Sequence, residues 1–148
     1  MRLPVLSIIL TFIVFAASLS ACRKENNTTN NTTLTGKWKL IKYHNLTART
    51  SEPEPANIPR SIIIDFSDNG LKGKMNGHTV TNFVSGEYEL LQNNKIKTVS
   101  FGGTKVGEPG WGNKFWDAIY SASSYELQGD KLFIFFKADS EKMEFKKE

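Results

Sequence analysis

The sequence predicts a mainly β domain of the α+β type, a curved antiparallel sheet or small open barrel of about eight strands with one helix near the C-terminal third. Three observations support this fold class. Short runs alternate apolar and polar residues from about residue 34 onward, which is typical of half-buried strands. Glycine, asparagine and aspartate separate these runs at short intervals. Only one segment repeats its apolar residues with helical spacing.

The first half of this domain contains three expected strands. They are residues 36–41, 61–66 and 71–75, separated by a proline-rich loop at 47–60 and a turn at 68–70. Alternation in the first strand places Trp38 and Leu40 on one face. In the second strand it directs Ile62, Ile64 and Phe66 inward, so we expect both faces to line a common core.

The second half contains further strands and the helix. The expected strands are residues 79–83, 87–91, 95–101, 124–127, 131–136 and 141–145, with Ser85-Gly86 joining the first two. A glycine-rich loop at 102–112 leads to the helical segment. Asn113 is its expected cap, and Phe115, Ile119 and Ala122 recur with the spacing of one helix face.

The N-terminal 21 residues have the pattern of an export signal. Arg2 is the only charged side chain before Cys22, and the residues between them are largely apolar. A permanent transmembrane helix would need about 20 apolar residues, which this segment barely reaches. Its end, Leu19-Ser20-Ala21-Cys22, resembles the lipobox of bacterial lipoproteins. The resemblance implies cleavage after residue 21 and lipidation of Cys22; the alternative is an ordinary secretory signal with a chance cysteine.

The domain organisation follows from this signal. Residues 1–21 form the expected lipoprotein signal peptide, 22–33 an expected disordered polar tether, and 34–148 the folded domain. Fully extended, the tether reaches about 35–40 Å at about 3.3–3.6 Å per residue. Arg23 follows the cysteine, which by resemblance to enteric sorting favours the outer membrane. Whether the domain faces the periplasm or the cell surface stays open.

Composition excludes several kinds of chemistry. Cys22 is the only cysteine, so the folded domain has neither a disulfide nor a cysteine-based metal site. The net charge is +4, but the lysines are scattered and often alternate with apolar residues. That pattern indicates solvated strand faces, and we expect no nucleic-acid partner. The expected partners are the membrane, through the lipid anchor, and an envelope protein or small ligand.

No catalytic constellation is evident. His44 and His78 are the only histidines, and their spacing suits neither a metal site nor a Ser-His-Asp triad. Glu87 and Glu89 share one strand face and are expected to be its solvated side. We therefore expect no enzyme activity, metal or cofactor.

Aromatic residues gather around the expected helix. They are Trp111, Phe115, Trp116 and Tyr120. Core packing is the simplest explanation for this group. Because aromatic residues also concentrate at interfaces, Trp111 and Trp116 are candidates for a binding surface.

Three motifs, taken in order, resemble the META domain family of HslJ-like bacterial lipoproteins. The opening Leu-x-Gly-x-Trp-x-Leu is present with Gly36 and Trp38. Asn-x-x-x-Gly-x-Tyr is present as Asn82, Gly86 and Tyr88. A Thr-Lys pair follows at Thr104, before the helix, and a Tyr-x-x-x-Gly-x-x-Leu segment begins at residue 125. The match covers nearly the whole domain.

The chain departs from that family where cysteines are common. Thr81 precedes the motif asparagine, and Val106 and Gly107 follow the Thr-Lys pair, so a redox role is excluded. The family has no established enzymatic activity. The resemblance implies a non-enzymatic envelope protein linked to stress or drug tolerance.

A second, weaker resemblance is to the lipocalins, which also have Gly-x-Trp on the first strand and a helix near the end. It would imply a barrel that carries a small apolar ligand in an internal cavity. The Asn-x-x-x-Gly-x-Tyr motif favours the META resemblance.

Overall fold

The structure is a computed structural model that describes residues 33–148. This part of the chain forms nine strands and one helix, confirming a mainly antiparallel β fold. The elements are β1 (Gly36–Asn45), β2 (Thr50–Pro53), β3 (Ile63–Asp68), β4 (Lys72–His78), β5 (Phe83–Leu91), β6 (Lys95–Gly103), α1 (Gly110–Tyr120), β7 (Ala122–Gln128), β8 (Lys131–Phe136) and β9 (Glu141–Lys147). The expected signal peptide, Cys22 and all of the tether except Thr33 lie outside the described residues.

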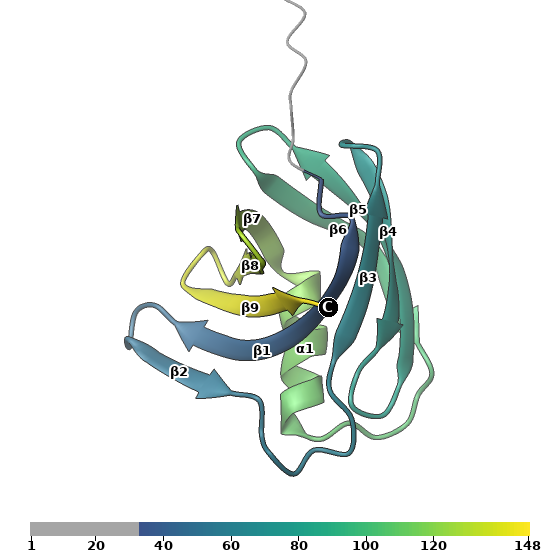
Figure 1. Ribbon diagram of the computed structural model, residues 1–148, viewed down its shortest axis with the longest axis vertical. Coiled ribbons are helices and arrows are strands. Elements are labelled where there is room, and N and C mark those ends of the chain that lie inside the picture. The colour runs from purple at the N-terminus through teal and green to yellow at the C-terminus, as the bar shows by residue number, and fades with distance from the viewer. Residues whose placement is uncertain (1–32) are drawn as a thin grey trace, which may run out of the picture.

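The strands form one sheet that closes on itself. Their order is β2-β1-β3-β4-β5-β6-β7-β8-β9, and β1 also pairs with β9. Eight strands therefore make a ring, and the short β2 is added beside β1 (Figure 1). All pairings are antiparallel, as hairpin-like connections require.

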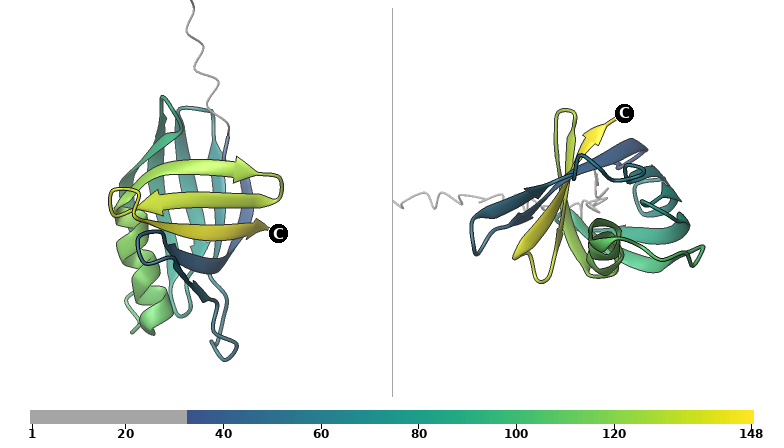
Figure 2. Two further views of the ribbon diagram at one scale, coloured as in Figure 1. Left: turned by 90° about the vertical axis from the view of Figure 1, so that its left-hand side faces the viewer. Right: turned by 90° about the horizontal axis from the view of Figure 1, so that it is seen from below.

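β1 joins the two halves of the ring. Its first residues pair with β3, its last residues pair with β2, and its other edge pairs with β9. The β1–β9 register shifts between Leu40 and Lys42, which bends the strand. As a result β7, β8 and β9 lie across β3 to β6 as a second layer (Figure 2, left).

Neighbouring strands of the ring share the least backbone pairing between β6 and β7. Their register contains the single pair Lys95–Ser124, supplemented by a bond from the Tyr125 amide to the Asn94 carbonyl. The helix packs beside this gap: the Thr98 hydroxyl donates to the Ile119 carbonyl, and the rings of Phe101 and Phe115 lie 5.9 Å apart. Helix α1 thus covers the place where the sheet has least backbone pairing.

The core lies between the two layers. It contains the inward side chains of every ring strand and the buried face of α1. Expected inward residues such as Trp38, Leu40 and Ile64 are at most 2 % exposed. Among the described residues, those from 34 onward complete the sheet and the core, so we expect residues 33–148 to fold as a unit. None of the helices in this part of the chain is long and apolar enough to cross a membrane.

Three sequence expectations about elements were wrong. Residues 79–83 and 87–91 are not two strands joined at Ser85-Gly86. β5 runs unbroken through Gly86, and Thr79 to Asn82 form a turn. Glycine is needed at position 86 because β6 passes close to it: a Cβ atom there would lie 2.3 Å from the Ser100 carbonyl oxygen.

The other two errors concern local propensity. The expected loop at 47–60 contains β2, which pairs with the end of β1. Helix α1 begins at Gly110 with Pro109 as its N-cap, rather than after Asn113. Proline fits this end of a helix because its missing N–H would be unpaired there in any case.

Candidate functional site

Asn82 lies at the centre of a polar cluster at one end of β5. The turn before it is closed by a bond of 2.8 Å from the Thr79 amide to the Asn82 carbonyl. Arg60 reaches over this turn and donates to both the Thr79 and the Asn82 carbonyls. The Asn82 residue is only 1 % exposed, although an amide side chain ordinarily prefers water.

Both polar atoms of the Asn82 side-chain amide form hydrogen bonds with the loop at 104–109. Its Nδ2 donates to the Val106 carbonyl and to Glu108 Oε1, each at 2.8 Å. Its Oδ1 accepts from the Thr104 hydroxyl at 2.9 Å and the Val106 amide at 2.7 Å. Two of the motif residues, Asn82 and Thr104, are therefore direct partners. Together they fasten the loop that leads into α1.

Glu108 completes this cluster. Its Oε1 also accepts from the Thr79 hydroxyl, while its Oε2 is buried with no hydrogen-bond partner among the described residues. Burial alone would raise the pKa of Glu108, but hydrogen bonds from Thr79 and Asn82 outweigh it and lower that pKa. Glu108 is therefore a stable anion at neutral pH.

A shallow hollow of about 350 Å³ opens beside the cluster. The residues that line it include Asn82, Thr104, Lys105, Glu108, Asn113 and Trp116. Trp116 is half-buried and packs edge-on against Phe101, with ring centroids 4.9 Å apart. The hollow thus offers one aromatic ring, one cation, the Glu108 carboxylate with its lowered pKa, and several amide or hydroxyl groups, a set that suits binding better than general acid catalysis near neutral pH.

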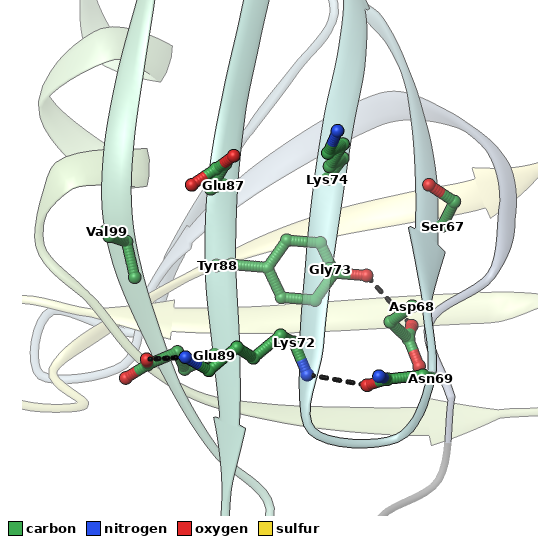
Figure 3. Close-up of a pocket in the computed structure, with 10 residues that line it drawn as sticks. All are labelled: Ser67, Asp68, Asn69, Lys72, Gly73, Lys74, Glu87, Tyr88, Glu89 and Val99. Atoms are coloured by element: carbon green, nitrogen blue, oxygen red, sulfur yellow. Dashed lines mark hydrogen bonds and ion pairs between the residues drawn. The ribbon is translucent and has the colours of Figure 1, made fainter.

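Tyr88, another motif residue, belongs to a separate cluster. Its ring lies against Gly73, where a Cβ atom would come within 2.3 Å of Tyr88 Cζ. Its hydroxyl donates to Asp68 Oδ2 at 2.8 Å, and the Leu34 amide donates to the same oxygen at 2.9 Å (Figure 3). Burial alone would raise the pKa of Asp68, but the amide of Gly70 and the Tyr88 hydroxyl lower it.

A groove of about 450 Å³ passes over this second cluster on the β3–β6 half of the sheet. Lysines and glutamates of β4 and β5 border it, as Figure 3 shows for Lys72 and Glu89. Their ammonium and carboxylate groups are 3.5 Å apart. Glu87 is exposed while Tyr88 and Leu90 are buried, which confirms the expected solvated face of this strand.

The opening motif has a structural place at the start of β1. Trp38 Nε1 donates to the Leu34 carbonyl at 2.8 Å, and the residue is buried. Gly36 has φ +138°, which residues with a side chain rarely adopt. Both residues therefore fix how the chain enters the ring.

The two candidate tryptophans differ in exposure. Trp111 is 4 % exposed, stacks edge-on against Tyr43 at 4.5 Å, and accepts the Tyr43 hydroxyl on its carbonyl oxygen. It therefore offers a partner no open surface, and core packing accounts for its position. Trp116 remains a candidate because its ring borders the hollow.

The histidines lie apart. His44 Nε2 contacts Glu144 Oε2 at 2.7 Å on the outside of the ring, whereas His78 lies near Arg60. Burial and the Arg60 charge lower the pKa of His78. Within residues 33–148 no group of His, Cys, Asp or Glu side chains is arranged to hold a metal ion.

Sequence reasoning missed the roles of Thr79, Asp68 and Glu108. All three act through partners far away in the chain, which no local pattern reveals. Glu108 did carry one weak signal, since it directly precedes the Pro109-Gly110 start of the helix, where a carboxylate is favourable.

No family model and no curated protein sequence matches the chain. Two solved structures share its fold. A DUF4847 family protein from Bacteroides vulgatus ATCC 8482 is 15% identical, with a TM-score of 0.59 over 78% of this chain and 94% of that one. A protein from Burkholderia xenovorans is 16% identical, with a TM-score of 0.60 over 76% of this chain and 81% of the other. At these identities the similarity establishes the ring-like β fold that the three chains have in common.

Proposed function

We propose that this chain is a lipid-anchored protein of the bacterial cell envelope whose META-like domain acts by binding and not by catalysis. The observation that carries the anchor is the sequence Leu19-Ser20-Ala21-Cys22 behind an uncharged apolar segment. Arg23 assigns the anchor to the outer membrane. The domain's role is in envelope stress, through an envelope protein or small ligand.

The state of the carboxylates supports a binding role. A general acid that works near neutral pH needs a raised pKa, whereas the pKa values of Asp68 and Glu108 are lowered. Both carboxylates are engaged by hydroxyl and amide donors that hold loops in place. These two carboxylates thus serve to hold the loops of the domain in place.

The positions of the motif residues support the META-like assignment. Asn82 and Thr104 bond to each other although they are far apart in the sequence. Tyr88, Gly36 and Trp38 have separate structural tasks in the Asp68 cluster and at the start of β1. Each motif residue thus has a defined structural role, and the hollow beside Trp116, which Asn82 and Thr104 help to line, is the binding region that we assign to the motif.

A carrier with an internal cavity is the less favoured function. Inward aromatic side chains occupy the space between the two layers: the Phe66 and Tyr88 rings are 5.5 Å apart, and those of Tyr43 and Phe136 are 6.5 Å apart. The hollows described above open outward and are bordered by polar residues. We therefore place ligand binding on the outside of the ring.

Metabolic labelling with a fatty acid tests the anchor. The wild-type protein should take up label and fractionate with membranes, and Cys22→Ser should abolish the labelling because it removes the acylated thiol. Ser18→Ala is the matched control, since it lies in the same segment but outside the four-residue motif. Labelling that persisted in Cys22→Ser would refute the lipid anchor.

A further inference from the structure

The outer faces of the two halves of the ring differ in how their charged side chains are paired. Across β1, β3, β4, β5 and β6, lysines stand opposite carboxylates. These cross-strand pairs are Lys37–Asp65, Lys74–Glu87, Lys72–Glu89 and Glu89–Lys97. Opposite charges in such positions stabilise a sheet. The lysines and carboxylates on the outer face of this half therefore compensate one another's charge.

Across β1, β9 and β8 one carboxylate, Glu144 opposite Lys42, lies among lysines that stand opposite one another. Lys39 stands opposite Lys146, and Lys146 stands opposite Lys131, so three lysines form one row over three strands. Further along the same strands, Lys142 stands opposite His44. Like charges directly opposite one another destabilise a sheet, so these lysine pairs cost stability.

One buried carboxylate partly offsets this charge. Glu144 lies between the two rows, is 4 % exposed, and contacts His44 Nε2 and Lys131 Nζ at 2.7 Å each. Lys39 is paired with Glu54 at 2.9 Å. Within residues 33–148, Lys42, Lys142 and Lys146 form no direct ion pair. We call these three side chains together with Lys131 the basic face.

The basic face is open and contains aromatic rings. Lys142 Nζ lies 4.1 Å above the Phe133 ring centroid and 5.5 Å from that of Phe135. Strands β7, β8 and β9 present this side with no other element in front of it (Figure 2, left). Neither of the hollows described above lies on it. Its charge is thus spread over a broad surface and is not gathered into a pocket.

We propose that the basic face lies against a bilayer through anionic phospholipid headgroups. Lysine ammonium groups bind phosphate as point charges, and each contributes to adhesion when it lies close to a negatively charged leaflet. A broad cationic surface without a groove fits a plane of phosphates better than a single folded ligand. Phe135, half-buried beside Lys142, adds an apolar contact at the level of the headgroups.

Membrane contact through the basic face adds to the proposed function. Its physiological setting rests on that function, because the lipid anchor is what brings the domain to a membrane. An anchor at Cys22 would hold the domain within about 35–40 Å of the membrane, the reach of the extended tether. Confinement at that distance converts weak surface attraction into lasting contact, because the second binding event becomes intramolecular. The surface chemistry itself belongs to residues 33–148 and can be measured without the anchor.

The test is flotation of residues 33–148 with vesicles of phosphatidylcholine that contain about a third phosphatidylglycerol, at about 0.05 M and about 0.5 M salt. The domain should float with these vesicles at low salt, should be released at high salt, and should ignore vesicles of pure phosphatidylcholine. The double variant Lys42→Gln with Lys146→Gln should bind about 30-fold more weakly, since each lysine accounts for about fivefold.

The matched control is Lys74→Gln with Lys97→Gln, which removes the same charge from exposed positions on the other half of the ring. It should weaken binding less than about threefold, and circular dichroism should show both double variants folded. Equal loss in the two double variants, or no flotation at low salt, would overturn the proposal. So would binding to soluble polyphosphate in the absence of vesicle binding. If the domain fails to bind vesicles while Cys22 is still labelled, the basic-face proposal is wrong and the lipid anchor is unaffected.

Discussion

Replacing Asn82 by alanine is the sharpest test of the polar cluster. The change removes the amide that fastens the loop at 104–109, where it makes bonds of 2.7–2.9 Å to Thr104, Val106 and Glu108. A hydrogen bond contributes about 0.5–1.5 kcal/mol net, and partners that reach water recover part of that loss. Thr104 and Val106 are exposed and can be rehydrated, whereas Glu108 is only partly exposed. We expect a loss of about 2–4 kcal/mol.

Urea unfolding followed by tryptophan fluorescence measures this loss. The midpoint should fall while the slope with denaturant is unchanged, because the native fold is the same. Asn76→Ala is the control: Asn76 is an exposed asparagine of β4 that should tolerate the change.

The substitution Asn82→Asp separates hydrogen bonding from charge. It keeps an acceptor for Thr104 but places a carboxylate oxygen against Glu108. Its destabilisation should therefore be larger at pH 7 than at pH 5, where protonation of one of the two acids relieves the repulsion. A loss below about 1 kcal/mol in Asn82→Ala, or no pH dependence in Asn82→Asp, would show that this cluster does not hold the loop.

Three further outcomes are expected. Gly73→Ala places a methyl group within 2.3 Å of Tyr88 Cζ and should cost about 1–3 kcal/mol by thermal unfolding; an unchanged melting temperature would contradict the packing. Tyr88→Phe should raise the pKa of Asp68 in an NMR titration, because it removes a hydroxyl donor. Because Asp68 and Glu108 have lowered pKa values, their contribution is complete above the unfolded values of about 4 and is lost as pH falls through the folded ones. Urea midpoints should therefore fall as the pH is lowered below about 4, and less so in Glu108→Gln.

Alternation of apolar and polar residues made most strands predictable. Lys131–Phe136 has the expected bounds, and the inward residues of β1 and β3 are the expected ones. The errors arose where tertiary contacts override local propensity. Gly86 looked like a turn residue, yet it stays in a strand because β6 approaches it too closely for any side chain.

The polar cluster was predictable only in part. The motif residues Asn82 and Thr104 were identified from the resemblance, but that resemblance did not say they touch. The roles of Glu108 and Thr79 depend on a loop folding back over a turn, and such contacts have no period in the sequence. The basic face was missed for a related reason: lysines on β1, β8 and β9 look scattered along the chain, and only the sheet register aligns them.

The pairing of β1 with β9 has a consequence for how the chain is made. β1 is the first strand of the ring to be synthesised and its partner β9 is the last, so the ring closes only once all of its strands have been made. Until then β1 keeps an unpaired edge, which is an aggregation hazard. Contacts between residues so distant in sequence also slow folding. The ring of this domain is therefore completed only when the residues of β9, up to Lys147, are available to pair with β1.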